Sequence, residues 1–232
     1  MRITVIGASG LIGNKVVDRL RAGGHEVVPA TRASGVDVLT GAGLADALAG
    51  ADAVVDVTNS PSFEPDAVLD FFTRAATNIA EAARGAGVAH SVALSIVGVD
   101  GLPDSPYFRA KVAQEGVITG AGIPWTIVRA TQFAEFTDAI VTSMTVGDEV
   151  RVPDALIQPI PAEDVAAAVA EAAAGEPRNA ILDIGGPEKV SFERMAIDVL
   201  ARRGGTAPRV VIDPAARYFG ARLSSESLVT PD

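Results

Sequence analysis

The feature that most constrains the fold is a set of three glycines directly after the first apolar segment. Residues 3–6 have the apolar, β-branched character of a buried strand, and residues 11–22 have the spacing of an amphipathic helix. Between them, Gly7 permits a sharp exit from the strand, Gly10 lets a ligand approach the backbone, and Gly13 lets the helix pack closely on the sheet. The alternative is a tight turn without a ligand.

A helix that begins at such a turn presents unpaired N–H groups and a partial positive charge, which suit a diphosphate. The G-x-x-G-x-x-G spacing, placed at the first strand-to-helix junction, therefore predicts dinucleotide binding. The residues expected to surround the phosphates are Gly7, Ser9, Gly10, Leu11, Ile12 and Gly13.

The rest of the chain alternates strand-like and helical segments. Apolar runs that we expect to be strands lie at residues 27–30, 53–57, 91–95, 126–129 and 180–184. A further short apolar run, at residues 36–39, follows the first of these. Helical patterns lie at residues 44–48, 66–84, 107–119, 163–174 and 192–203. This order predicts an α/β, doubly wound parallel sheet, the Rossmann fold. We expect one domain over residues 1–232, with residues 133–160 and 205–232 as substrate-cleft or lid segments.

The amino-acid composition excludes several classes of function. The 232 residues are 48% hydrophobic, enough for one sizeable core, and the net charge of −10 disfavours nucleic-acid binding. No stretch has the roughly 18 apolar residues that span a bilayer, and a strand pattern follows Met1 at once, so we expect a cytoplasmic protein without a leader or membrane contact. There is no cysteine, and His25 and His90 are the only histidines, so we predict neither disulfides nor a metal site.

A tyrosine and a lysine four residues apart form the candidate catalytic pair. Pro106 suits the first turn of a helix, and the offset then places Tyr107 and Lys111 on one helix face. A phenol ordinarily titrates near pH 10, and a nearby ammonium stabilises its anion, so such a pair can exchange protons with a substrate. The alternative role for Tyr107 is that of an apolar residue at the start of an amphipathic helix.

Several segments together resemble a known family. They read GASGLIG at 7–13, LSIVG at 94–98, PWTIVRATQF at 124–133, EDVA at 163–166 and LDIGGP at 182–187. This pattern is similar to the extended and atypical branch of the short-chain dehydrogenases/reductases, near its NmrA-like, NAD(P)H-binding members. The resemblance extends to about Gly204 and leaves the last residues unplaced.

The resemblance implies roles for individual residues. Tyr107 would be the proton donor, Lys111 would bind the nicotinamide ribose, and Ser95, at the end of the preceding strand, would orient the substrate carbonyl. It places Asp37, Val38, Thr58 and Asn59 beside the adenine and ribose, and Ala130, Gln132 and Phe133 at the nicotinamide or substrate cleft. One departure is that Phe72 aligns with the asparagine of the family's catalytic tetrad, although Asn78 lies on the same predicted helix. The family also suggests a homodimer.

The coenzyme should be selected at the end of the second strand. A carboxylate there favours NAD, whereas an arginine suits the 2′-phosphate of NADP. Arg32 can pair with a phosphate in a bidentate manner, and Thr31 or Ser34 can add a hydroxyl, while no carboxylate occurs before Asp37. We therefore expect NADP(H) to be preferred over NAD(H). The alternative is a solvated surface arginine.

These patterns favour an NADP(H)-dependent oxidoreductase that transfers hydride between nicotinamide and a small carbonyl, enone or quinone. A second hypothesis is a non-catalytic dinucleotide sensor of the NmrA-like type. A third is a sugar-nucleotide epimerase or dehydratase, which is disfavoured because few residues outside the cofactor fold remain to enclose such a substrate.

Overall fold

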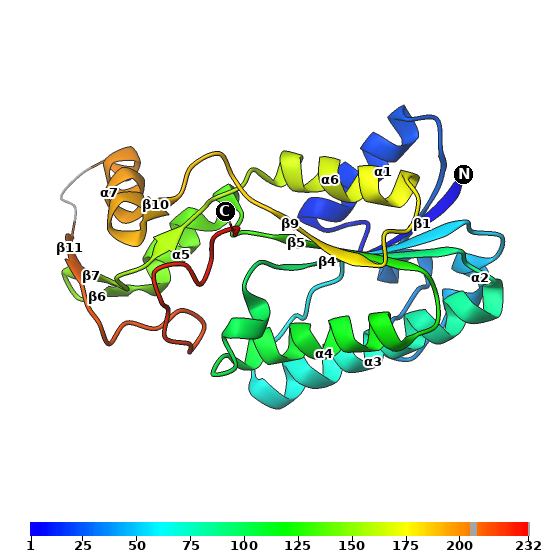
Figure 1. The fold of residues 1–232 in the computed structure, drawn as a ribbon, viewed down its shortest axis with the longest axis horizontal. Helices are drawn as coiled ribbons and strands as arrows, with labels where there is room; N and C mark the ends of the chain where they lie inside the picture. The colour runs from blue at the N-terminus through cyan, green and yellow to red at the C-terminus, as the bar shows by residue number, and fades with distance from the viewer. Residues whose placement is uncertain (205–207, 232) are drawn as a thin grey trace.

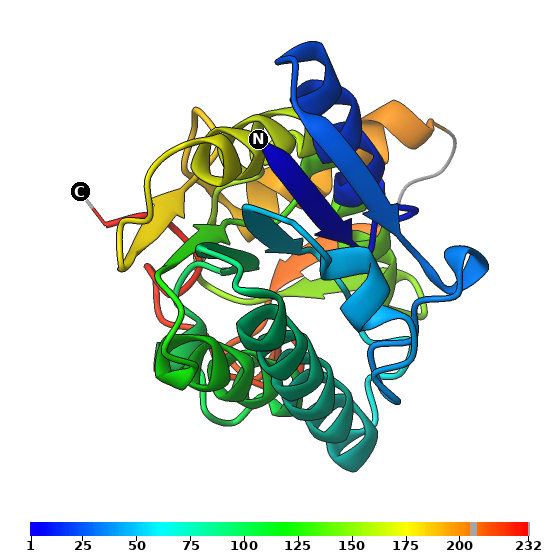
Figure 2. The same ribbon diagram turned by 90° about the vertical axis from the view of Figure 1, so that its right-hand side faces the viewer.

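The computed structural model describes residues 1–204 and 208–231. Its centre is a six-stranded, fully parallel sheet in the order β2-β1-β3-β4-β5-β9 (Figures 1 and 2). The strands are β1 (Arg2–Ile6), β2 (Glu26–Ala30), β3 (Ala53–Asp56), β4 (His90–Ile96), β5 (Trp125–Ala130) and β9 (Ala180–Ile184). The predicted doubly wound Rossmann fold is thus confirmed.

Helices cover both faces of the sheet, as Figure 1 shows. The upper face is covered by α1 (Leu11–Ala22) and α6 (Ala162–Ala174), and the lower face by α3 (Pro65–Ala86) and α4 (Pro106–Gly120). The short helix α2 (Leu44–Leu48) packs against α3. Alanine dominates α6, which allows it to pack closely against the strands and α1.

The sheet order reverses beside β1, which positions the site. β1 pairs with β2 on one side and with β3 on the other, so the chain leaves β1 in one direction and later returns to continue in the other. In doubly wound sheets the ligand crevice lies outside the carboxyl ends of the strands at such a switch point. The crevice is therefore expected next to Gly7 and the residues that follow Asp56.

A smaller region lies beyond the carboxyl ends of the strands, on the left of Figure 1. It consists of α5 (Thr137–Ser143), β6 (Thr145–Val146), β7 (Glu149–Val152), β8 (Leu156–Ile157), β10 (Val190–Ser191), α7 (Phe192–Arg203) and β11 (Arg209–Ile212). Two small sheets, β11-β7-β6 and β10-β8, share a second core around Phe192. This region includes most of the predicted lid segment 133–160. Of the segment 205–232, residues 205–207 and 232 lie outside the described residues.

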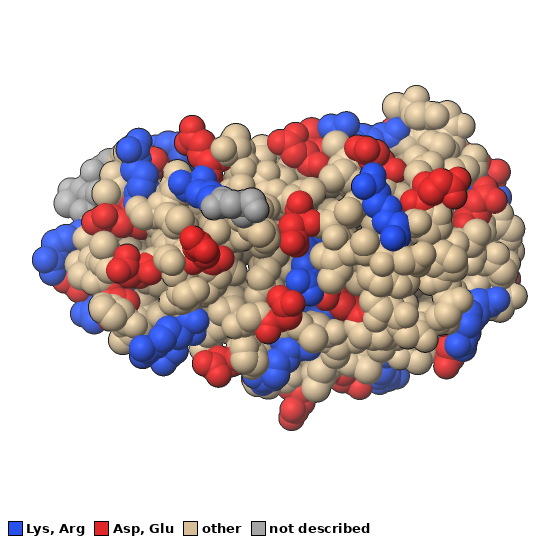
Figure 3. Space-filling view, viewed as in Figure 1, with Lys and Arg blue, Asp and Glu red and all other residues tan. Residues whose placement is uncertain are grey.

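The apolar run at 36–39 forms no strand. Asp37 folds it into a turn instead, because its Oδ1 accepts the backbone N–H of Leu39 at 2.8 Å. Within the described residues, no helix combines the length and apolarity needed to cross a bilayer. On the face drawn in Figure 3, acidic and basic side chains are interspersed.

Candidate functional site

The glycine turn is built so that two of its glycines are required. Gly7 has a φ of +85°, and a Cβ added there would lie 2.9 Å from the carbonyl oxygen of Val57. A Cβ added at Gly13 would lie 2.1 Å from the carbonyl oxygen of Gly7. Gly7 therefore makes the turn, and Gly13 lets α1 lie directly against it.

The start of α1 fits an anionic group. Gly10 is the N-cap and provides no side-chain cap, the first turn carries no acidic residue, and Ser9, Gly10 and Leu11 are exposed. The first N–H groups of a helix need partners from outside it, and a diphosphate can supply them. Ile12 is buried in the core around α1, so it could contact a coenzyme through its backbone only.

At the end of β2, Arg32 is exposed, and it makes no ion pair with any other described residue. The hydroxyls beside it are engaged: Ser34 N–H donates to Thr31 Oγ1 at 3.2 Å, and Thr31 N–H donates to Ser34 Oγ at 2.9 Å. This capping box fixes the turn that carries Arg32. The arginine is thus the group in this turn that remains available to a phosphate.

The loop with Asp37 and Val38 is anchored to α3. Asn78 Nδ2 donates to the carbonyl oxygens of Val38 at 2.8 Å and Leu39 at 3.1 Å. The Asp37 carboxylate forms the turn described above, which is the structural alternative to contact with adenine. The side-chain amide of Asn78 therefore holds this loop against α3.

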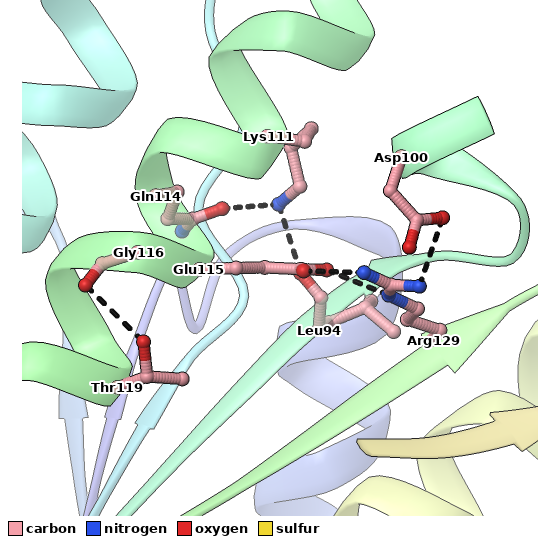
Figure 4. Close-up of polar contacts among 8 residues, drawn as sticks. All are labelled: Leu94, Asp100, Lys111, Gln114, Glu115, Gly116, Thr119 and Arg129. Carbon is pink, nitrogen blue, oxygen red and sulfur yellow. Dashed lines mark hydrogen bonds and ion pairs between the residues drawn. The ribbon is translucent and has the colours of Figure 1, made fainter. Parts of the chain in front are cut away.

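Two buried residues of α4, Lys111 and Gln114, link this helix to β4 and β3, and Figure 4 shows the two bonds of Lys111. Lys111 Nζ donates to the Leu94 carbonyl oxygen at 2.9 Å and also to Gln114 Oε1. Gln114 Nε2 in turn donates to Asp56 Oδ2 at 2.7 Å. The other Asp56 oxygen accepts the N–H and the hydroxyl of Thr58. Gln114 thus connects a buried ammonium to a buried carboxylate, and its amide gives each of them a hydrogen bond.

Burial lowers the pKa of Lys111 from 10.5 to about 8, although Asp56 and Glu115 act in the opposite direction. Its Nζ also lies 4.6 Å from the centre of the Phe72 ring. Below pH 8 the ammonium therefore remains charged in an environment that strengthens its electrostatic effects on neighbours.

The burial of Lys111 predicts how the free energy of unfolding depends on pH. Between pH 8 and 10.5 the folded protein has lost this proton while the unfolded chain retains it, so raising the pH through this window disfavours unfolding. The free energy of unfolding of the wild type should therefore rise relative to that of Lys111→Met, by about 3 kcal/mol across the window. Urea unfolding of both proteins at several pH values measures the difference between their free energies of unfolding. The ionisation of other groups at alkaline pH affects both proteins equally and cancels in this difference. A constant difference would contradict the buried, charged lysine.

Tyr107 lies in the first turn of α4, where Ser105 caps the helix by accepting the N–H of Phe108 at 3.3 Å. Its hydroxyl donates to Asn59 Oδ1 at 2.8 Å, and burial raises its pKa to about 12. Its ring meets Phe72 edge-on, with 5.7 Å between centroids. Phe72, the residue aligned with the family's asparagine, thus contacts both Tyr107 and Lys111.

Two buried polar atoms among the described residues have no hydrogen-bond partner where a ligand is expected. They are Ser95 Oγ at the end of β4 and Gln132 Oε1 just beyond β5. Ala93 packs against Ile118 of α4, so the two-residue period of a strand turns Ser95 toward the same helix. A buried polar atom without a partner costs free energy, so these positions fit a ligand that supplies the missing bonds.

Some of the predicted site residues are connected to one another by direct contacts. Gly7 abuts Val57 and Thr58, Asn59 binds Tyr107, and Lys111 binds the carbonyl that precedes Ser95. Ala130 ends β5, and Phe133, which follows Gln132, pairs with Ile160 in a β-bridge. Arg32 follows the edge strand β2, whereas the loop of Asp37 reaches α3, where Val38 packs against the same cluster as Tyr107.

The sequence reasoning missed an ion pair and a cavity. Arg129 forms two bonds with Glu115, at 2.9 and 2.6 Å, and one with Asp100 at 3.2 Å (Figure 4). A cavity of about 410 Å³ lies beside it, lined partly by Asp100, Asp183 and the C-terminal residues 229–231. A charged residue inside an apolar strand was the available signal for Arg129.

Comparisons with known proteins identify the family of the chain. Residues 7–176 match the family described as NAD(P)H-binding. A divinyl chlorophyllide a 8-vinyl-reductase, chloroplastic, of Oryza sativa subsp. indica is 31% identical over 91% of this chain, and the chain spans 61% of that relative.

Solved structures share the fold. MoeE5 in complex with UDP-glucuronic acid and NAD has a TM-score of 0.74 and 24% identity, covering 96% of this chain and 88% of its own. Triphenylmethane reductase of Citrobacter sp., complexed with NADP(H), has a TM-score of 0.67 and 18% identity, covering 92% and 79%. By the family match over most of its length, the chain belongs to the NAD(P)H-binding family, within the fold of the short-chain dehydrogenases/reductases.

Proposed function

We propose that this chain is an NADP(H)-preferring reductase that transfers hydride to a small carbonyl, enone or quinone. The observation that carries the proposal is the placement of Tyr107 and the buried Lys111 against one Phe72 ring, in the set of contacts that begins at the glycine turn. The name of the rice relative, a vinyl-reductase, supports a reductase.

The chain's own residues would supply binding and proton transfer. The coenzyme would be held by the start of α1, by Arg32 and by Gln132, and when bound in reduced form it supplies a hydride. Tyr107 holds a proton at its hydroxyl, because its pKa of about 12 keeps it protonated at neutral pH. After it protonates the substrate oxygen, the Lys111 ammonium would stabilise the phenolate until solvent returns a proton. Ser95 Oγ can donate a hydrogen bond to the substrate oxygen.

Arg32→Glu tests the coenzyme preference. A bidentate bond between a guanidinium and a phosphate contributes about 1.5–3 kcal/mol, so the Kd for NADPH should rise by roughly 10- to 100-fold. The Kd for NADH, which lacks the 2′-phosphate, should change little. Titrations followed by coenzyme fluorescence measure both values.

Arg84→Glu is the matched control, because it makes the same charge change at an exposed arginine in the last turn of α3. It should leave both affinities unchanged. Equal weakening of NADPH and NADH by Arg32→Glu would refute the proposed selectivity. Failure of the wild type to bind either coenzyme would refute the proposed function itself.

A dinucleotide sensor is the second candidate, and the undisturbed hydrogen bond between Tyr107 and Asn59 is the observation that favours it. In a sensor this bond would be purely structural. The two functions differ in whether substrates oxidise the bound coenzyme.

A further inference from the structure

Two exposed aromatic rings stand beside Tyr107. Phe63, in the connection from β3 to α3, is 57% exposed, and Phe219, near the C-terminus, is 43% exposed. Their centroids lie 5.6 Å apart, and those of Phe63 and Phe219 lie 5.5 and 5.6 Å from Tyr107. The three rings thus form a triangle, with two members open to solvent.

These two rings are the outer members of a larger cluster. Only 5% of the residues are aromatic, yet most of the aromatic side chains join this one network. The members behind the triangle are buried, namely Phe71, Phe72, Phe108, Phe192 and Tyr218. The inner rings belong to the hydrophobic core. The exposed faces of Phe63 and Phe219 need another explanation, because covering a large aromatic side chain is energetically favourable.

The backbone at Phe219 is also unusual, because it has a conformation that bulky residues rarely adopt. Tyr218 and Ala221 exchange two backbone hydrogen bonds, and Phe219 and Gly220 between them have φ angles of +48° and +84°. Such a two-residue turn favours asparagine followed by glycine, and a bulky residue in the left-handed region is an outlier. Strain of this kind concentrates at ligand sites. The turn sits against the start of α4, since a Cβ on Gly220 would lie 4.0 Å from Pro106 Cδ.

We propose that Phe63 and Phe219 bind the flat, conjugated part of the substrate, and thereby select aryl ketones, quinones or similar planar carbonyl compounds over aliphatic ones. The inference rests on the proposed reductase function, since Tyr107, which contacts both rings, would protonate the substrate. Flat π-systems gain contact with ring faces that a puckered ring cannot match.

A matched pair of ketones tests this selectivity. 1-Tetralone and 1-decalone share a bicyclic carbon skeleton and one carbonyl, but only the first carries a flat aromatic ring. With NADPH, the wild type should show a kcat/KM for 1-tetralone about tenfold or more above that for 1-decalone. Phe63→Leu and Phe219→Leu keep apolar bulk, remove the ring face, and should each reduce this ratio several-fold. Ile197→Ala, at an exposed apolar residue of α7, should leave the ratio unchanged.

A second pair of variants separates recognition from stability. Phe219→Asn and Phe219→Ala both remove the ring, but asparagine suits the left-handed turn better, so the Tm of Phe219→Asn should be higher. The Kd for 1-tetralone, measured calorimetrically with NADP⁺ present, should nevertheless rise about equally, by roughly tenfold, in both variants. A loss of affinity that follows the Tm instead would show a structural role and overturn the inference.

The remaining outcomes distinguish the two proposals. If the wild type reduces both ketones equally and the leucine variants leave the ratio at one, the planar selectivity is wrong and the reductase function stands. If no coenzyme is oxidised but 1-tetralone still binds through Phe63 and Phe219, the reductase function is wrong and the aromatic site stands. Absence of 1-tetralone binding by the wild type overturns the inference.

Discussion

Glu115→Gln is expected to lower the free energy of unfolding by about 3–5 kcal/mol, because it leaves the buried guanidinium of Arg129 without its main counter-charge. Glu115 holds two of the Arg129 nitrogens, and these bonds raise the pKa of Arg129 above its usual value. The pair joins α4 to β5 across the lower face of the sheet. Urea unfolding at pH 7 measures the loss.

The same guanidinium provides its own control. Asp100 also binds Arg129, at 3.2 Å, but its side chain is 65% exposed, whereas that of Glu115 is 9% exposed. Asp100→Asn should therefore cost less than about 1 kcal/mol, since water screens an exposed pair. The double variant Arg129→Met, Glu115→Leu should recover much of the stability lost in Glu115→Gln, because it removes the unpaired charge. Equal costs for the two carboxylates would contradict this account.

The elements around the coenzyme crevice could be predicted because each carries a local signal. The helices at 11–22 and 44–48 were predicted with their observed bounds, since glycines mark their starts and apolar periodicity fills them. The spacing of Tyr107 and Lys111 was equally readable, because Ser105 and Pro106 fix where α4 begins. These signals lie within a few residues of the structure that they specify.

The missed features depend on contacts that are distant in the sequence. Gln114 meets Asp56 across 58 positions, and no local pattern states which of several polar residues on α4 faces β3. β6, β8 and β10 have two residues each, too short for any periodicity to show. The partner of Tyr107 was missed for the same reason: Asn59 was assigned to the coenzyme, and only the fold shows that its side chain reaches the tyrosine.

Tyr107→Phe is expected to reduce kcat by roughly 10²- to 10⁴-fold, the range that a well-placed general acid contributes. The variant keeps the ring and its contact with Phe72, and it loses only the hydroxyl that binds Asn59. Because that hydroxyl is not needed to hold the diphosphate at α1, the Kd for NADPH should remain within about twofold of the wild-type value. Steady-state rates with a reducible ketone and coenzyme titrations provide the two numbers.

The pH profile sharpens this test and also separates a reductase from a sensor. A tyrosine with a pKa of about 12 remains a proton donor throughout the accessible range, so the wild-type rate should not fall through its ionisation. Lys111, with a pKa of about 8, loses its charge first, and kcat should decline above pH 8 because the phenolate is then no longer stabilised. In Tyr107→Phe the residual rate has no phenolate to stabilise, so this decline should disappear. A sensor would oxidise no coenzyme in either form, and its affinity for NADPH would not distinguish tyrosine from phenylalanine.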